Sequence, residues 1–148
     1  MFVSIVIVLL IVLGMLATVL MLTHEEEDMP PPTGGPPGKR IINSTSVAIE
    51  LGRINPIPRP TDLRITLERN GTHSGQYDFQ SDDDGPLVHV NGDVVGTIHY
   101  GDLADNQRVN VGDVLKIREL RPGSNYKLIL SWSSTGDVIM TTSFSTPP

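Results

Sequence analysis

The pattern of apolar positions divides the chain into two parts. From Met1 to Leu22 nearly every residue is apolar, no residue is charged, and only Ser4, Gly14 and Thr18 interrupt the run. At ~1.5 Å per residue the run is ~33 Å long in a helix, which is enough to cross a bilayer. A strand of this length with two apolar faces has no place in so small a domain. The run therefore predicts one long α-helix, buried in a membrane or in the core of a protein assembly.

A polar and proline-rich segment follows the apolar run. The acidic stretch from His24 to Asp28 is followed by prolines and glycines between Pro30 and Gly38. Successive prolines cannot continue a helix and favour an extended conformation, while glycines add freedom. We expect the helix to end near Asp28. We predict three segments, an apolar helix with an acidic end at residues 1–28, a linker at 29–40 and a β domain at 41–148.

From Ile41 onward the pattern changes to short alternating runs that are separated by turn residues. In residues 62–69 the apolar side chains recur at every second position, and Asn70-Gly71 then favours a turn. Asn91-Gly92 is a second hairpin signal because both residues tolerate positive φ. No amphipathic helix of useful length is present. We expect strands at residues 46–51, 62–69, 76–79, 87–90, 94–100, 114–120, 126–132 and 138–144.

The fold class follows from the number of strands and from one local motif. Leu120, then Pro122-Gly123, then Tyr126 resembles the tyrosine corner of immunoglobulin-like sandwiches, in which the Tyr hydroxyl bonds back to the turn backbone. The alternative is an ordinary turn before a strand with a half-buried Tyr. We predict α+β content overall, with one long N-terminal apolar α-helix and an all-β immunoglobulin-like sandwich of about seven or eight strands. Leu120, Tyr126 and Trp132 are its expected fold-determining residues.

Charge and cysteine content exclude several classes of function. The net charge is −6 and the pI is about 5.0, so the chain lacks the clustered Lys and Arg that nucleic-acid binding needs. The absence of cysteine excludes disulfides, redox pairs and thiolate metal sites. We therefore expect no nucleic-acid partner.

The candidate sites for chemistry are few. Asp82, Asp83 and Asp84 form an acidic loop whose spacing does not fit an EF-hand, so a solvated turn is favoured over a Ca²⁺ site. His89 and His99 lie on opposite sides of the Asn91-Gly92 turn, where they could be cross-strand neighbours in a weak metal site. No nucleophile and base, phosphate loop or hydrolase motif can be proposed from spacing. We predict a non-enzyme with no catalytic residues and no cofactor.

Two tripeptides match the acceptor pattern for N-glycosylation. They begin at Asn43 and Asn70. The pattern also arises by chance in chains rich in Ser and Thr. Glycosylation of either Asn depends in addition on an extracellular location.

The start of the chain carries no positive charge. Signal peptides and signal anchors place Lys or Arg before the apolar segment, but the first basic residue here is Lys39. Two explanations are open. In the first, a basic leader is removed before Met1. In the second, the acidic residues from Glu25 to Asp28 set the orientation of the helix in the membrane, and Lys39-Arg40 lies on the outer side.

A long apolar helix followed by a β domain is the arrangement of archaeal type IV pilins and archaellins, and the chain resembles them in both halves. Its start, Met-Phe-Val-Ser-Ile-Val-Ile at residues 1–7, looks like the mature start of archaeal pilins. Bacterial type IV pilins place an acidic residue near the start of the helix, whereas the first acidic residue here is Glu25. The segments similar to the pilin C-terminal half are Gly101-Asp102-Leu103, residues 111–115, Arg121-Pro122-Gly123, residues 128–132, residues 136–139 and Ser143-Phe144.

This resemblance implies a structural subunit of an extracellular archaeal type IV pilus-like filament that serves surface adhesion. The helix would pack in the filament core and the sandwich would lie outside. The implied partners are further copies in a helical homopolymer, the membrane before assembly, a leader peptidase and the pilus assembly machinery. The alternative is a membrane-anchored β-sandwich, stator-like or a surface binding module, that does not polymerise. The expected polymerisation residues are Met1, Phe2, Val3, Ile5, Val6, Leu9, Leu10, Leu13, Gly14 and Ala17.

Overall fold

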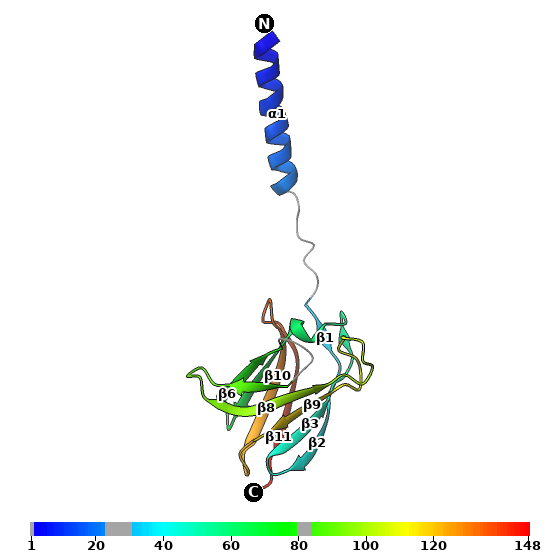
Figure 1. Ribbon diagram of the computed structural model, residues 1–148, viewed down its shortest axis with the longest axis vertical. Coiled ribbons are helices and arrows are strands. Elements are labelled where there is room, and N and C mark those ends of the chain that lie inside the picture. Colours follow the sequence, from blue (N-terminus) through cyan, green and yellow to red (C-terminus); the bar gives the residue numbers. More distant parts are fainter. Residues whose placement is uncertain (1, 23–30, 80–83) are drawn as a thin grey trace. The chain divides into compact units, whose positions relative to one another are not determined.

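The computed structural model describes residues 2–22, 31–79 and 84–148, and on the helix it describes the side chains of residues 4–18. The chain separates into two compact units, Met1–Pro30 and Pro31–Pro148. The first contains the helix α1 and the second contains all the strands (Figure 1). An N-terminal helix followed by an antiparallel β-sheet domain is therefore the observed organisation, as the sequence predicts.

The helix α1 spans Phe2–Leu22. The Thr18 hydroxyl donates to the Gly14 carbonyl oxygen at 2.7 Å, so this side chain is satisfied within the helix. The segment at 23–28, which the sequence predicts to extend the helix, lies outside the described residues. Within the described residues, no helix is long and apolar enough to cross a membrane.

The second unit consists of strands, short turns and one 3-10 turn, η1 at Pro60–Asp62. The eight expected strand segments all contain a strand, whereas the strands before residue 46 and the short β4 were not expected. The strands are β1 (Thr33–Gly34), β2 (Gly38–Asn43), β3 (Ser46–Glu50), β4 (Ile54–Asn55), β5 (Leu63–Arg69), β6 (Thr72–Asp78), β7 (Gly85–Val88), β8 (Val94–Gly101), β9 (Val114–Arg118), β10 (Asn125–Trp132) and β11 (Val138–Ser145).

The predicted immunoglobulin-like sandwich is wrong. Nine strands form one antiparallel sheet in the order β11-β10-β5-β6-β7-β8-β9-β3-β2, and β1 pairs with β4 in a small separate sheet. The pairing runs without a break through the meander from β5 to β9, where a sandwich would divide it between two sheets. Register shifts in the β2–β3, β5–β6, β7–β8 and β10–β11 pairings bend the sheet around its core.

The sheet is nearly closed and barrel-like (Figure 1). Its two edge strands are β2 and β11, and the Lys39 Nζ of β2 donates to the Ser143 carbonyl oxygen of β11 across the seam. A closed arrangement needs only one apolar face on each strand, which is the same alternation that a sandwich needs. The alternation in the sequence therefore fits both folds.

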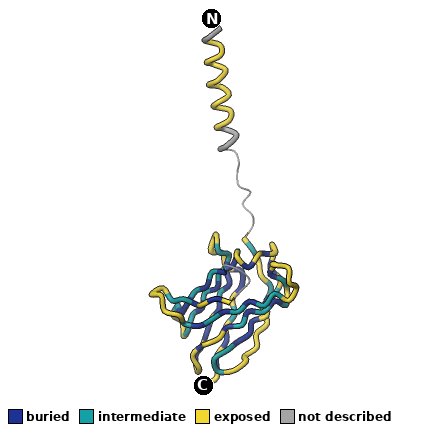
Figure 2. The backbone as a smooth tube through the Cα atoms, viewed as in Figure 1, coloured by how far each residue is buried: buried dark blue, intermediate teal, exposed yellow. Residues whose placement is uncertain are grey.

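The inner face of this sheet is a single apolar core (Figure 2). The rings of Tyr77 and Phe79 meet edge-to-face with centroids 4.8 Å apart, and Phe79 meets Tyr100 in the same way at 5.9 Å. Gly85 of β7 lies against the Tyr77 ring, and a Cβ at this position would overlap the ring. The fully buried aliphatic residues include Val47, Ile49, Ile65, Leu67, Leu87, Ile98, Ile117, Leu128 and Leu130.

The hydrogen bond predicted for Tyr126 is present. The Arg121 backbone N–H donates to the Tyr126 hydroxyl oxygen at 2.9 Å, and the Tyr126 ring stacks on Phe144 at 5.4 Å. Leu120 and Tyr126 are buried, and Trp132 packs on the core while partly exposed. These residues close a corner of a single curved sheet, so the local motif is correct while the sandwich inferred from it is not.

Candidate assembly helix and polar sites

The surface of α1 consists almost wholly of exposed apolar side chains. Large aliphatic or Met side chains at positions 5–13, 15 and 16 are between 52% and 67% exposed. Nine of them are consecutive, so at 100° per residue they cover every side of the helix. An amphipathic helix has one polar side that can face water, but the side chains described at residues 4–18 form no such side. Its side chains must be covered by apolar groups supplied from outside the described unit.

The residues predicted for polymerisation are distributed over this surface. Ile5, Val6, Leu9, Leu10 and Leu13 are each more than half exposed. Gly14 and Ala17 are exposed, and a Cβ at Gly14 would meet nothing within 4 Å. Because Gly14 and Ala17 are small, the backbone of another helix could approach α1 closely at these positions. The side chains of Met1, Phe2 and Val3 lie outside the described ones.

The acidic loop is only partly described. Asp82 and Asp83 lie outside the described residues, while Asp84 makes an ion pair with the His99 ring of β8. Across residues 2–22, 31–79 and 84–148, no group of three or more His, Cys, Asp or Glu side chains could hold a metal ion.

His89 and His99 are not cross-strand neighbours. The β7–β8 register pairs Gly85 with Ile98 and Val88 with Val94, which places the two histidines at opposite ends of the hairpin. The hairpin loop is longer than its two turn residues, because the His89 N–H bonds to the Asp93 carbonyl oxygen at 2.8 Å. Leu87 pairs with Gly96 and Gly85 with Ile98, which are the pairs that a turn centred on Asn91-Gly92 gives. The expectation is wrong because His99 is much farther from this turn than His89, so the two cannot lie opposite each other.

His89 instead lies near a residue that the sequence did not single out. Its ring centroid is 5.8 Å from that of His73 on β6, and its Nδ1 lies 2.8 Å from the Asn91 Oδ1. Both rings line a shallow groove of about 410 Å³. The groove also receives side chains of both charge signs, namely Arg69, Asp93, Glu119 and Arg121. This mixture offers polar contacts of both charge signs.

Asp113 is a fully buried carboxylate whose role is structural. Its side-chain oxygens accept hydrogen bonds from the Tyr100 hydroxyl at 2.6 Å, the Asn110 N–H at 2.7 Å and the Leu103 N–H at 3.1 Å. Together these bonds fix the loop between β8 and β9. The sequence shows only an Asp after a Gly, which is typical of a turn, and does not reveal this burial.

One ion pair changes a pKa. Arg64 of β5 and Asp78 of β6 are cross-strand partners, and the Arg64 Nε donates to the Asp78 Oδ1 at 2.6 Å. This hydrogen bond raises the pKa of the Arg64 guanidinium above its ordinary value. Both side chains are more than one third exposed, so the pair contributes little to stability.

The two predicted glycosylation sites differ in local geometry. Asn43 is exposed at the β2–β3 turn, and its Oδ1 accepts from the Thr45 N–H at 2.9 Å and the Thr45 hydroxyl at 3.0 Å. Asn70 has φ of 51° at the β5–β6 turn, and its Oδ1 accepts from the Asn125 N–H at 2.9 Å. The amide of Asn43 is therefore bound to its own tripeptide, and that of Asn70 to a distant strand.

A comparison with protein-family models finds no match for this chain, and a comparison with curated proteins finds no relative of significant sequence similarity.

Proposed function

We propose that this protein is a structural subunit of an extracellular filament resembling an archaeal type IV pilus. In this proposal the α1 helices of many copies pack together in the filament core. The barrel-like β domains form the outer surface, which is the part available for adhesion and for any glycan at Asn43 or Asn70.

The observation that carries the proposal is the uniformly apolar surface of α1. Moving a Leu, Ile or Val side chain from water to an apolar environment contributes about 1.5–3 kcal/mol. Ten such side chains and Met15 on α1 are more than half exposed, so covering them supplies a strong driving force for association. Neighbouring helices can cover all sides of a helix only in an assembly of several copies, whereas a dimer would leave one side bare.

The β domain supports the same division of roles. It has an apolar core of its own, and exposed apolar side chains such as Val90, Leu103 and Val111 lie in its turns and loops. Strand positions that reach the solvent carry charged side chains such as Arg64, Lys116 and Lys127, which suits a surface in contact with water.

The test is assembly of the full chain after removal of detergent, measured by sedimentation. We expect wild-type protein and Leu10→Ile to sediment as large polymers, and Leu10→Asp to remain in the supernatant at protein concentrations roughly a hundredfold higher. A charge at position 10 would have to be buried between helices, while the matched Leu10→Ile keeps the apolar surface.

The β domain supplies the internal control. The near-ultraviolet circular dichroism of the domain should be the same in the wild type and both variants, because the substitutions are confined to α1. If Leu10→Asp polymerised as readily as wild type, the helix would not be the assembly element. If wild-type chains entered lipid vesicles as monomers and never sedimented as lipid-free polymers, the proposal would fail in favour of a lipid-anchored module.

A further inference from the structure

A second surface on the β domain has a composition unlike the rest of this acidic chain. It is a groove of about 590 Å³ on the outer face of the sheet, above β3 and between β2 and β9. Three basic side chains line it, Arg40 from β2 and Lys116 and Arg118 from β9. No acidic side chain is among its lining residues in the described part of the domain.

The sheet register explains why a groove forms here. Ala48 of β3 pairs with Arg40 on one side and Lys116 on the other, so these side chains stand in one row on one face. Val47 and Ile49 on either side of Ala48 are fully buried, which makes the face of Ala48 the outer one. The short Ser46 side chain of β3 lines the groove between the long basic side chains, and Ile41, Ile42 and Asn43 of β2 complete the lining.

Among the described residues, no ion pair includes the basic side chains of the groove. The ion pairs among the described residues join Arg64 to Asp78, His99 to Asp84 and Lys127 to Glu68, and none includes the three groove cations. The nearest carboxylate along β3 is Glu50, two residues beyond Ala48 on the same face, and it lines a neighbouring groove together with Arg40. Three like charges held together without pairing favour an anionic partner.

The shape and spacing of the groove favour an acidic peptide. Lys116 and Arg118 are two residues apart on one strand, so their Cα atoms are separated by ~6.6 Å. Carboxylates at every second residue of an extended peptide have the same spacing. No aromatic side chain lines the groove in the described structure, so the stacking platform that sugar rings commonly use is missing. The chain itself contains four consecutive acidic residues, Glu25 to Asp28.

We propose that this basic groove binds the acidic segment Glu25–Asp28 of a second copy of the chain. The inference rests on the proposed function, since it adds a charge contact between neighbouring subunits to the packing of their helices. Arg40 and Lys116 bind carboxylates from the two walls of the groove, and Arg118 extends the contact along the strand. The contact is electrostatic and weakens as the salt concentration rises.

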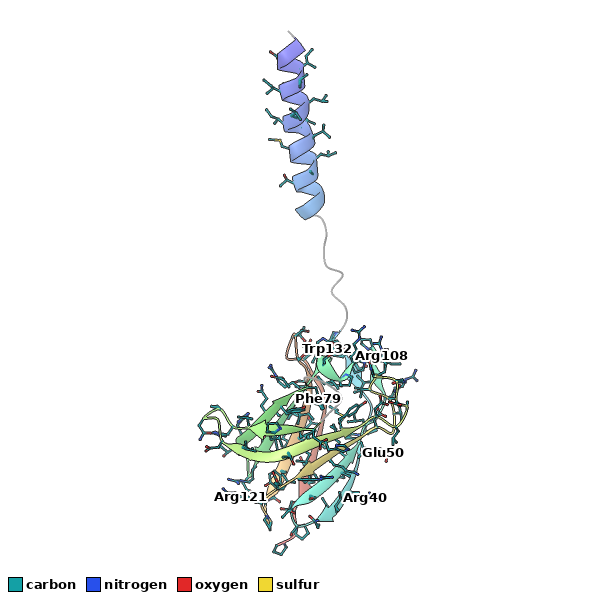
Figure 3. The ribbon with its side chains drawn as sticks, in the orientation of Figure 1. Arg40, Glu50, Phe79, Arg108, Arg121 and Trp132 are labelled. Atoms are coloured by element: carbon teal, nitrogen blue, oxygen red, sulfur yellow. The ribbon has the colours of Figure 1, made fainter. Side chains whose placement is uncertain are left out.

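The test uses a labelled peptide of residues 23–35 and the full chain in mild detergent. The protein carries Glu25→Gln, Glu26→Gln, Glu27→Gln and Asp28→Asn, so its own acidic segment does not compete. Fluorescence anisotropy should show salt-sensitive binding that Lys116→Glu/Arg118→Glu weakens at least about tenfold. The matched control Arg59→Glu/Arg108→Glu makes the same change of charge at another groove, and Figure 3 shows Arg108 far from Arg40. This control should bind almost as well as the parent.

Two results would overturn the inference. One is equal binding by the groove variant and the control variant, and the other is equal binding of the acidic peptide and a peptide with Gln and Asn in place of its acidic residues. Circular dichroism of each variant verifies that the domain is folded. Because the measurement is made on detergent-bound chains, it succeeds or fails independently of filament formation.

Discussion

Leu10 of α1 is 64% exposed, whereas Leu128 of β10 has no exposed surface. The two side chains are chemically identical, so the difference comes from what surrounds them. In the β domain, strands that are distant in sequence wrap around Leu128 and its neighbours. In the helix unit, no described residue packs over Leu10 and its neighbours. The β domain supplies the apolar environment of Leu128 from its own strands, while a helix that is apolar on all sides depends on other molecules for an apolar environment.

The same substitution, Leu to Ala, should have very different effects in the two regions, and this is the largest difference that we expect. We expect Leu128→Ala to lower the free energy of unfolding of the β domain by about 2–5 kcal/mol, because it opens a cavity in a closely packed core. Leu10→Ala should leave that free energy unchanged. Urea unfolding of the full chain in mild detergent, followed by the fluorescence of the single tryptophan, Trp132, measures both values. A comparable loss in both variants would show that the helix contributes to the domain's stability.

A smaller effect is expected at the buried carboxylate of Asp113. Asp113→Ala should cost about 1–3 kcal/mol, because the Asn110 and Leu103 N–H groups and the Tyr100 hydroxyl lose their acceptor. The loop between β8 and β9 should also become more sensitive to limited proteolysis. Asp105→Asn in the same loop is the control, because Asp105 is exposed and Asn tolerates its positive φ of 49°, so the change should affect stability little. Equal stability of the two variants would contradict this role of Asp113.

The smallest of these effects should come from Tyr126→Phe. The change removes one hydrogen bond to the Arg121 N–H and keeps the ring that stacks on Phe144, so we expect a loss of about 1 kcal/mol. Tyr126→Ala also removes the buried ring and should cost about 3–5 kcal/mol. Thermal unfolding of both variants separates the hydrogen bond from the packing. A Tyr126→Phe variant as unstable as Tyr126→Ala would contradict this division.

Local patterns in the sequence predicted much of this domain. Leu63, Ile65 and Leu67 alternate on β5 and are all buried, and Asn70-Gly71 forms the turn to β6 with positive φ at both residues. The Tyr126 hydrogen bond was also predictable, because it spans only five residues along the chain. In each case the interaction that fixes the structure lies within a few residues of the pattern.

Features that depend on distant pairing were not predictable. β2 reads Gly-Lys-Arg-Ile-Ile-Asn and is exposed along its whole length, so it shows no alternation, and it follows a proline-rich segment. The choice between a sandwich and a single curved sheet depends on pairings such as Gln76 with Val88 and on register shifts that alternation does not encode. The basic groove is missed for the same reason, since Arg40 is far from Lys116 and Arg118 in sequence.

The most direct test of the central claim is electron cryomicroscopy of the full chain after detergent has been removed. The account predicts filaments in which α1 helices from many copies pack in the core at interaxial distances of about 8–10 Å, with the β domains outside. Filaments held together by the β domains alone, with α1 out of contact with other copies, would contradict it.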